Sequence, residues 1–239
     1  MSDELKWLAF IALAYLIGAI PFGLIIARSK GVDLRAHGSG NIGATNVLRT
    51  LGKKAGILCF TLDALKGALP VALSGAVMGV MGRGELAPID ALWWLAVAMA
   101  TVLGHMFTIF ARLRGGKGVA TAFGALCAMW PVVTPATVAA LIAWYITLRL
   151  TRYVSVASCV AALVLPACVL AFRASGLMTN NQTTPGDRIA SAWPFLAITS
   201  ALAALVIYKH RANLARVRAG TEHRVGNRAP RPADADPKT

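Results

Sequence analysis

The chain alternates between long apolar runs and short polar segments. A helix needs about 20 apolar residues to cross the hydrocarbon core of a bilayer, and five runs are close to or above this length: 5–27, 55–81, 91–110, 153–172 and 192–208. A sixth apolar stretch, 119–148, contains Pro131 and Pro135. Because almost all of the chain lies in or between these runs, the pattern predicts an all-α integral membrane protein with a single domain over residues 1–239.

The distribution of charge decides how the stretch 119–148 crosses the membrane. If it breaks at its prolines into a pair of short helices, one face carries the loops 28–54, 111–118, 149–152 and 209–239 with a net charge of +15, and the other face carries −1. A single crossing would separate the basic C-terminal segment from the other basic loops. Because cytoplasmic loops are enriched in Lys and Arg, we expect seven transmembrane helices, two of them short as a half-span pair, with the N-terminus outside and the C-terminus in the cytoplasm.

Composition supports a membrane location and limits the partners. The chain is 57% apolar and 14% charged, whereas soluble domains carry about 25% charged residues. Its net charge of +14 is explained by cytoplasmic loops that face anionic membrane lipids, so we expect no nucleic acid. The four cysteines lie in apolar runs without CxxC spacing, which indicates neither a metal site nor disulfides. The tail 229–239 is rich in Pro, Ala and Asp, and we expect it to be disordered.

The first cluster with candidate chemistry is the glycine-rich segment 38–52. The three glycines within residues 38–43 leave backbone N–H groups free to turn inward, and on a helix that starts near residue 44, Thr45 and Arg49 share a face. A glycine turn, a helix N-terminus and an arginine together are typical of an anion site. The segment also matches G-x-G-x-x-G, but an apolar helix precedes it, whereas a dinucleotide site needs a strand there. We therefore expect a ligand other than a nucleotide, and a flexible loop is the alternative.

A second cluster surrounds Lys117, which stands among the glycines of residues 115–118 just before an expected helix. An ammonium group beside free helix N–H groups suits a phosphate. The segment resembles a Walker loop, but Ala111 and Gly118 replace the glycine and the Ser or Thr which that motif requires, so no nucleotide is expected. Simple topology-setting charge is the alternative, and it accounts for the two arginines of this loop but not for its glycines.

Three further groups of polar residues stand out against the apolar runs. His210 and Asn213 are three residues apart at the end of the last run, so they share a helix face. Ser155 begins the run that follows the expected short pair, where a serine either binds a ligand or helps helices pack. Asp63 and Lys66 lie inside the second run, and we expect them to pair and support the site, a catalytic role being the less favoured alternative.

Several common catalytic motifs are absent from the sequence. No histidine is followed by Asp within five residues, as the His-x4-Asp acyltransferase motif requires, and there is no G-x-S-x-G elbow. The apolar runs hold too few acidic residues for a divalent metal cage. We therefore expect no metal and no cofactor.

Together these segments resemble the bacterial membrane acyl-phosphate:glycerol-3-phosphate acyltransferases. The resemblance covers nearly the whole chain and rests on the segments 38–49, 63–67, 104–105 with 115–121, 152–155, and 210–213 with 220–222. It implies a seven-helix enzyme of the bacterial inner membrane that transfers an acyl chain from acyl phosphate to the 1-O position of glycerol 3-phosphate, forming lysophosphatidate and phosphate. It also implies interplay with an enzyme that produces acyl phosphate. Two positions depart from the family pattern: Thr108 replaces the usual proline and Ala212 an acidic residue.

The resemblance also implies the residues of the site. Catalytic roles fall on Ser39, Arg49, Lys117, His210 and Asn213, and substrate- or phosphate-binding roles on Gly38, Gly40, Asn41, Thr45, Asn46, Gly116, Gly118, Thr121 and Ser155. The expected topology places all of them at the cytoplasmic face. An acyl phosphate is already activated, so the enzyme needs to hold two anions together and stabilise the developing oxyanion. The base is either His210 or a phosphate oxygen of the substrate, and we favour the substrate because no carboxylate–His pair is evident.

Two other classes of protein remain as alternatives. A transporter or exchanger of organic phosphates would also use basic loops in a helical bundle, but such proteins often show two similar halves, and this sequence contains no internal repeat. A non-catalytic protein that binds anionic lipids would not need the glycines around Lys117. The sequence does not indicate the acyl-chain length or the oligomeric state.

Overall fold

The computed structural model describes residues 1–176 and 184–226, and within them the chain is entirely helical apart from turns and loops. The elements are α1 (Asp3–Gly18), α2 (Phe22–Arg28), α3 (Ala44–Leu51), α4 (Lys53–Val77), α5 (Pro88–Met106), the 3-10 helix η1 (Ile109–Ala111), α6 (Val119–Cys127), α7 (Thr134–Thr151), α8 (Val154–Ser175), α9 (Pro185–Ala190) and α10 (Trp193–Arg218). This confirms the all-α prediction. The tail 229–239, for which the sequence predicts disorder, lies outside the described residues.

Five segments among the described residues are long and apolar enough to cross a membrane, and they match the five long runs of the sequence. They are Asp3–Arg28, Lys53–Val77, Pro88–Ala111, Val154–Ser175 and Trp193–Arg218. The first is interrupted: α1 ends at Gly18 and α2 starts at Phe22, because Pro21 has no N–H to continue the helical bonding. Ser2 caps the start of α1 by accepting the N–H of Leu5 at 3.4 Å.

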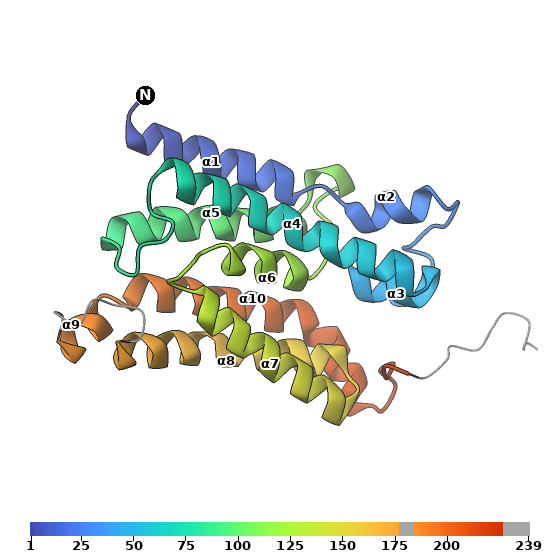
Figure 1. Ribbon diagram of the computed structural model, residues 1–239. Coiled ribbons are helices and arrows are strands. Elements are labelled where there is room, and N and C mark those ends of the chain that lie inside the picture. Colours follow the sequence, from blue (N-terminus) through green and yellow to red (C-terminus); the bar gives the residue numbers. More distant parts are fainter. Residues whose placement is uncertain (177–183, 227–239) are drawn as a thin grey trace, which may run out of the picture.

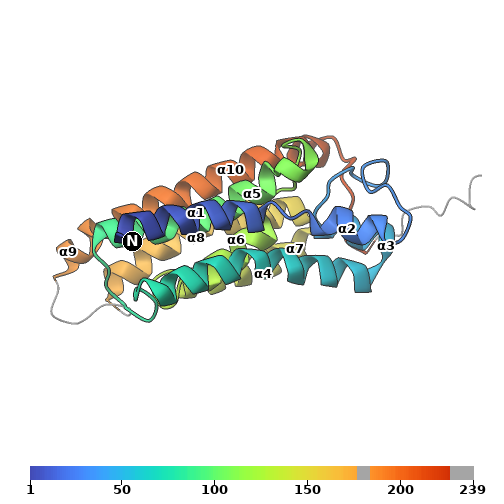
Figure 2. The ribbon, with the colours of Figure 1, turned by 90° about the horizontal axis from the view of Figure 1, so that it is seen from above.

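The helices form an elongated bundle in which α1, α4 and α5 pack together, as do α7, α8 and α10 (Figures 1 and 2). α6 lies between the two groups and contacts α4, α5 and α7. One end of the bundle holds α2, α3 and the end of α10, and the other holds the N-terminus and α9 (Figures 1 and 2). Segments far apart in the sequence therefore meet at the end that contains α2 and α3.

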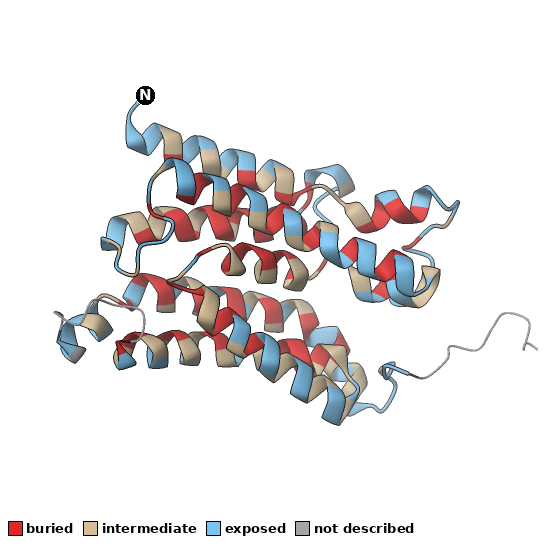
Figure 3. Ribbon diagram, viewed as in Figure 1, coloured by how far each residue is buried: buried red, intermediate tan, exposed pale blue. Residues whose placement is uncertain are grey.

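Small residues let the helix backbones approach closely. A Cβ on Gly67 in α4 would overlap the backbone of Thr121 in α6, and one on Gly124 would overlap that of Ala64. Between α1 and α5, Gly18 and Gly104 make equally close contacts with the opposite backbone. Such packing replaces the hydrophobic drive that helices lack in lipid. Many large apolar side chains remain exposed on the helices. Exposed positions are pale blue in Figure 3.

The stretch 119–148 breaks into two helices, but they are not the predicted half-span pair. α6 has 9 residues and α7 has 18, so at 1.5 Å per residue they are about 14 and 27 Å long. The turn between them reaches the loop after α4, where the N–H of Gly82 donates to the carbonyl of Trp130 at 3.0 Å. α6 is short because residues 112–118 before it are not helical and its first turn forms only at Val119. Only one helix of the pair is short.

Candidate active site

The first predicted cluster folds as a compact loop before α3, and the buried side chain of Asn46 organises it. The amide oxygen of Asn46 accepts the N–H of Ser39 at 2.9 Å, and its nitrogen donates to two carbonyls of the preceding loop at 3.2 and 3.1 Å. Gly38 has φ +60°, and a Cβ there would overlap the Asn46 amide oxygen and lie 3.4 Å from Cδ of Arg49. The sequence predicts that Asn46 binds substrate. The loop instead engages both ends of its amide, which favours a loop-shaping role.

The other predicted residues of this loop lie around the start of α3. The side-chain oxygen of Asn41 accepts the N–H of Gly43, the residue before α3, at 2.9 Å. A Cβ on Gly40 would lie 3.1 Å from a loop carbonyl. Ser39 and Thr45 are exposed, and no hydrogen bond joins either side chain to another predicted site residue. Binding roles for these four residues stay predictions.

The second predicted cluster, the glycine loop of residues 115–118, lies against the end of α5. Two of its N–H groups donate to carbonyls of α5 at 3.2 and 3.1 Å. A Cβ on Gly116 would overlap the ring of His105, and Gly118 has φ +77° where α6 begins. Both positions therefore require glycine. These contacts fix the backbone on both sides of Lys117, the only lysine in this loop.

Lys117 reaches across the bundle to the end of α10. Its ammonium group donates to the side-chain oxygen of Asn213, 96 residues away in the sequence. The nitrogen of the same amide donates to Glu222 at 2.6 Å, and the second oxygen of Glu222 accepts from Nε of Arg216 at 2.7 Å. Two residues with predicted catalytic roles, Lys117 and Asn213, are therefore in direct contact.

Arg49 lies close enough to this group to share its electrostatic field. Burial lowers the pKa of Arg49; the negative charge of Glu222 opposes this and Arg216 adds to it. Burial likewise lowers the pKa of Lys117 to about 8, again opposed by Glu222 and reinforced by Arg216 and Arg49. Three cationic groups therefore interact electrostatically with one carboxylate. The excess of positive charge is suited to an anionic ligand.

The remaining predicted residues are buried near the same end of the bundle. His210 is 2% exposed, its Nδ1 lies 2.8 Å from the carbonyl four residues earlier in α10, and it interacts electrostatically with Lys117 and Glu222. The hydroxyl groups of Thr121 and Ser155 are buried and have no hydrogen-bond partner among the described residues. Because an unpaired buried hydroxyl costs free energy, both are able to gain a bond when a ligand enters.

The segment after α10 contains no predicted site residue, although it folds over the same end of the bundle. The N–H of Val225 donates to the carbonyl of Arg152 at 2.8 Å, and Arg224 donates to the hydroxyl of Tyr153 at 2.9 Å. Glu222, in the same segment, bonds to Asn213 as described above. The signal that indicates Glu222 in the sequence is its place in the segment 220–222, one of those that carry the family resemblance.

The departure at Thr108 has a structural explanation. Its hydroxyl donates to the carbonyl of Ala19, within the break between α1 and α2, and accepts the N–H of Phe110 at 3.2 Å. Its φ is −66°, which lies within the range of proline. Thr108 therefore keeps a backbone conformation that proline also adopts and adds two bonds of its own.

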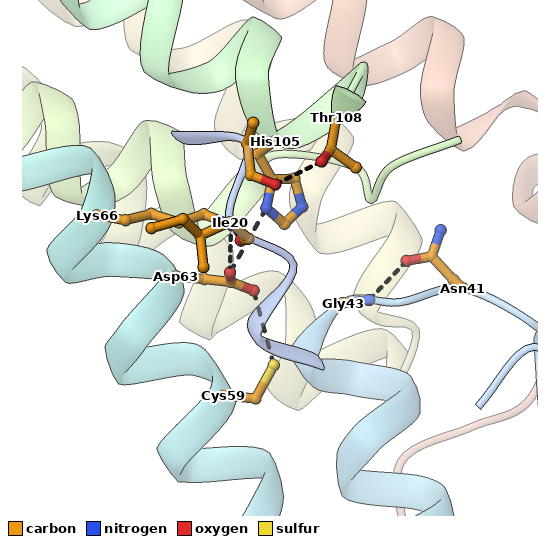
Figure 4. Close-up of polar contacts among 9 residues, drawn as sticks. Ile20, Asn41, Gly43, Cys59, Asp63, Lys66, His105 and Thr108 are labelled. Carbon is orange, nitrogen blue, oxygen red and sulfur yellow. Dashed lines mark hydrogen bonds and ion pairs between the residues drawn. The ribbon is translucent and has the colours of Figure 1, made fainter. Parts of the chain in front are cut away.

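The expected pairing of Asp63 with Lys66 is confirmed. Their charged groups are 2.7 Å apart inside the bundle, and both side chains are 2% exposed. Figure 4 shows the Asp63 carboxylate between Lys66, His105 and Cys59, with the carbonyl of Ile20 beside the lysine. The sequence did not indicate that His105 takes part in this cluster.

The described residues do not form a recognisable metal site. Within residues 1–176 and 184–226, no group of three or more His, Cys, Asp or Glu side chains is placed to hold a metal ion. The four cysteines are free thiols. The expectation that the protein uses no metal or cofactor stays a prediction.

A helical bundle with five candidate spans among the described residues, and with cationic and glycine-rich loops gathered at one end, defines a polytopic membrane protein. The family model of glycerol-3-phosphate acyltransferases matches residues 8–220. The chain belongs to this family and is therefore an enzyme, a glycerol-3-phosphate acyltransferase.

Individual relatives agree with the family model. A glycerol-3-phosphate acyltransferase of Geotalea daltonii is 40% identical over 210 residues, which cover 88% of this chain and 93% of the relative. A crystal structure of PlsY, an integral membrane glycerol 3-phosphate acyltransferase, in its glycerol 3-phosphate form has a TM-score of 0.74 and 38% identity, with 92% of this chain and 96% of that chain covered. The lysophosphatidic acid form has a TM-score of 0.72, 37% identity and the same coverage. This chain is accordingly an integral membrane protein.

Proposed function

We propose that the enzyme transfers an acyl chain from acyl phosphate to the 1-O position of glycerol 3-phosphate, giving lysophosphatidate and inorganic phosphate. The observation that carries this proposal is the contact between Lys117 and Asn213, with Arg49 and Arg216 in the same field. It gathers cations from three distant segments at one place. Both substrates are phosphate monoanions or dianions near neutral pH, so a cluster of this charge is able to hold them side by side.

The reaction needs positioning and charge stabilisation more than a covalent intermediate. The 1-hydroxyl oxygen of glycerol 3-phosphate attacks the carbonyl carbon of acyl phosphate, and the hydroxyl proton passes to a phosphate oxygen of the substrate. The bond from that carbon to the phosphate oxygen breaks, and phosphate leaves. Lys117 and Arg49 bind phosphate and stabilise the developing negative charge, with Ser39 and Asn213 as further donors. The hydroxyl groups of Thr121 and Ser155 have no hydrogen-bond partner among the described residues and can therefore bond to the same ligands.

The topology of the protein is part of the proposal. We propose seven transmembrane helices, with the N-terminus outside and the C-terminus in the cytoplasm of a bacterial inner membrane. The end of the bundle that holds α2, α3 and the segment after α10 then faces the cytoplasm, where the water-soluble acceptor enters. The acyl chain of the donor lies among the apolar helices, and a partner enzyme on the cytoplasmic side supplies acyl phosphate.

One assay tests the proposed reaction against its alternatives. Purified protein is incubated with acyl phosphate and glycerol 3-phosphate, and lysophosphatidate and released phosphate are measured. We expect the two products in equal amounts. If folded protein forms neither product but exchanges glycerol 3-phosphate across vesicle membranes, the protein is instead a transporter, and the acyl-transfer proposal is wrong.

The pH dependence of the reaction is expected to report Lys117. Because its pKa is lowered to about 8, kcat/KM for glycerol 3-phosphate should fall above pH 8 by about tenfold per pH unit, as free enzyme loses the cation. The groups that act on this lysine are Glu222, Arg216, Arg49 and Cys159. The measurement is kcat/KM from about pH 7 upward, where the acceptor is already a dianion.

The same range of pH should not unfold the protein through this group. A lysine in the unfolded chain has its ordinary pKa of 10.5, so between about pH 8 and 10.5 the unfolded state binds more protons than the native state at Lys117. The contribution of this group to the free energy of unfolding therefore rises with pH while activity falls.

A Lys117→Arg variant, which stays charged, should lose the fall in kcat/KM above pH 8. If the fall persists in this variant, it is assigned to another group.

His210→Ala is expected to retain measurable transfer. Nδ1 of His210 is bonded to a backbone carbonyl rather than to a carboxylate, so the side chain lacks the partner that usually orients a catalytic base. If a substrate phosphate oxygen takes the hydroxyl proton, kcat should fall by less than about 10²-fold, the lower bound for losing a general base. Complete loss of kcat with an unchanged Kd for glycerol 3-phosphate would assign the base to His210.

A further inference from the structure

Asp63, Lys66 and His105 form a deeply buried cluster of ionisable side chains that the proposed mechanism does not use. Nζ of Lys66 and Nδ1 of His105 lie 2.7 and 3.5 Å from the same carboxylate oxygen, and the three residues are 2 to 5% exposed. Sγ of Cys59 donates to the second oxygen at 3.7 Å. A buried ion pair of this kind is weak evidence for stability, since apolar residues of similar volume often stabilise a fold as well or better. Its place in the molecule therefore needs another explanation.

On one side, Lys66 connects the cluster through α2 to the loop that precedes α3. This connection is the first arm of the cluster. Nζ of Lys66 donates to the carbonyl of Ile20 at 2.6 Å, within the break between α1 and α2. α2 begins two residues later, and a Cβ on Gly23 would overlap the carbonyl of Ile42. Ile42 is 3% exposed and belongs to the loop of residues 38–43. The lysine thus fixes the short helix on which that loop rests, and Arg49 follows in α3.

The other arm reaches the glycine loop. The ring of His105 lies against Gly116, where even a Cβ would overlap Nε2, and the backbone carbonyl of His105 accepts the N–H of Gly116 at 3.1 Å. Lys117 is the next residue. A rotation of the His105 ring away from Asp63 would therefore meet the backbone of the glycine loop directly. Figure 4 shows the ring and Lys66 on two sides of the Asp63 carboxylate.

We propose that Asp63 is a positioning residue which, through Lys66 and His105, holds the two anion-binding loops at a fixed separation. The proposal rests on the proposed function, because it matters only if Arg49 and Lys117 act on substrates in one reaction. Asp63 touches neither substrate. Its effect is on the distance between the reacting groups, and a misplacement of about 1 Å can cost about 10²-fold in rate.

The test replaces both charges at once with the double variant Asp63→Asn/Lys66→Met, so that no unpaired charge is left in the bundle. We expect Tm near that of the unmodified protein, KM for glycerol 3-phosphate within about threefold, and kcat lower by about 10- to 100-fold. The alkaline limb of kcat/KM should also move to higher pH, because a displaced Lys117 is better solvated. Loss of packing alone would lower the amount of folded enzyme without moving that limb.

Ser74→Ala is the matched control. Ser74 lies in the same helix, is fully buried, and bonds only to a carbonyl three residues earlier. Its variant should keep kcat and the pH limb. A double variant with unchanged kcat and an unchanged limb would overturn the positioning role, whereas absence of transfer in the unmodified protein would overturn the proposed function instead.

A second variant covers the case in which the double variant does not fold. His105→Asn leaves Asp63 and Lys66 paired and removes only the ring that lies against Gly116. The proposal expects a lower kcat and a shifted pH limb here as well. If this folded variant has the kcat and the limb of the unmodified protein, the arm through His105 does not position the glycine loop, and the proposal is wrong.

Discussion

Lys117→Ala is expected to lower kcat/KM by about 10²- to 10³-fold, the usual cost of removing one donor that stabilises a developing anion. The ammonium group is held among glycines at one side and contacts Asn213 at the other. No other side chain of the glycine loop is able to replace it, because the flanking residues at 116 and 118 are glycines. The measurement is steady-state transfer of the acyl chain in detergent.

The stability of this variant separates a functional loss from an unfolded protein. Burial lowers the pKa of Lys117, which means that the fold disfavours its charge, so removal of the side chain should leave Tm unchanged or slightly higher. Lys54→Ala is a suitable control, because it removes the same charge from an exposed position at the start of α4. Near-normal turnover by Lys117→Ala would exclude this lysine from phosphate binding.

The long helices were predictable from the sequence because each corresponds to a run of apolar residues. All five candidate spans coincide with such runs, and the break at Pro21 follows from a missing N–H. The pairing of Asp63 with Lys66 was predictable for a related reason, since charges inside an apolar helix need partners and a spacing of three residues supplies one.

The geometry of the loops was less accessible, because it depends on contacts between distant segments. The short α6 was expected, but α7 is longer than a half span, because its helix starts at Thr134 and continues to Thr151, beyond the apolar stretch that ends at residue 148. The side chain of Asn46 is of a type that binds substrates, and in the structure its amide forms hydrogen bonds within its own loop. Glu222 lies far along the chain from Lys117, and no local pattern indicates that both side chains bond to the amide of Asn213.

Arg49→Ala is expected to reduce kcat/KM by about 10²-fold or more. Arg49 is half-buried in α3, beside Gly38, in the same field as Glu222 and Arg216. A guanidinium offers two parallel N–H donors to a phosphate, and an ammonium offers a point charge. Arg49→Lys should therefore recover only part of the activity, with a kcat/KM between those of the alanine variant and the unmodified enzyme.

Salt distinguishes a specific contact of Arg49 from general attraction of anions. Arg28→Ala removes an equal charge from an exposed position at the end of α2, and its small effect should vanish at high salt, where exposed charges are screened. The loss in Arg49→Ala should persist. If both variants lose the same activity and recover it alike with salt, Arg49 only steers substrates toward the membrane surface.

The double variant Arg49→Ala/Lys117→Ala tests whether the two cations serve one phosphate or two. The two side chains interact electrostatically, so their contributions are coupled if both stabilise the same leaving phosphate, and the double loss is then smaller than the product of the single losses. If Arg49 holds one substrate phosphate and Lys117 the other, the two losses should multiply. We expect the second result, because the two cations belong to separate segments: Arg49 lies in the last turn of α3, and Lys117 lies in the loop before the start of α6. Strongly non-multiplicative losses would reduce the proposed two-phosphate pocket to a single anion site.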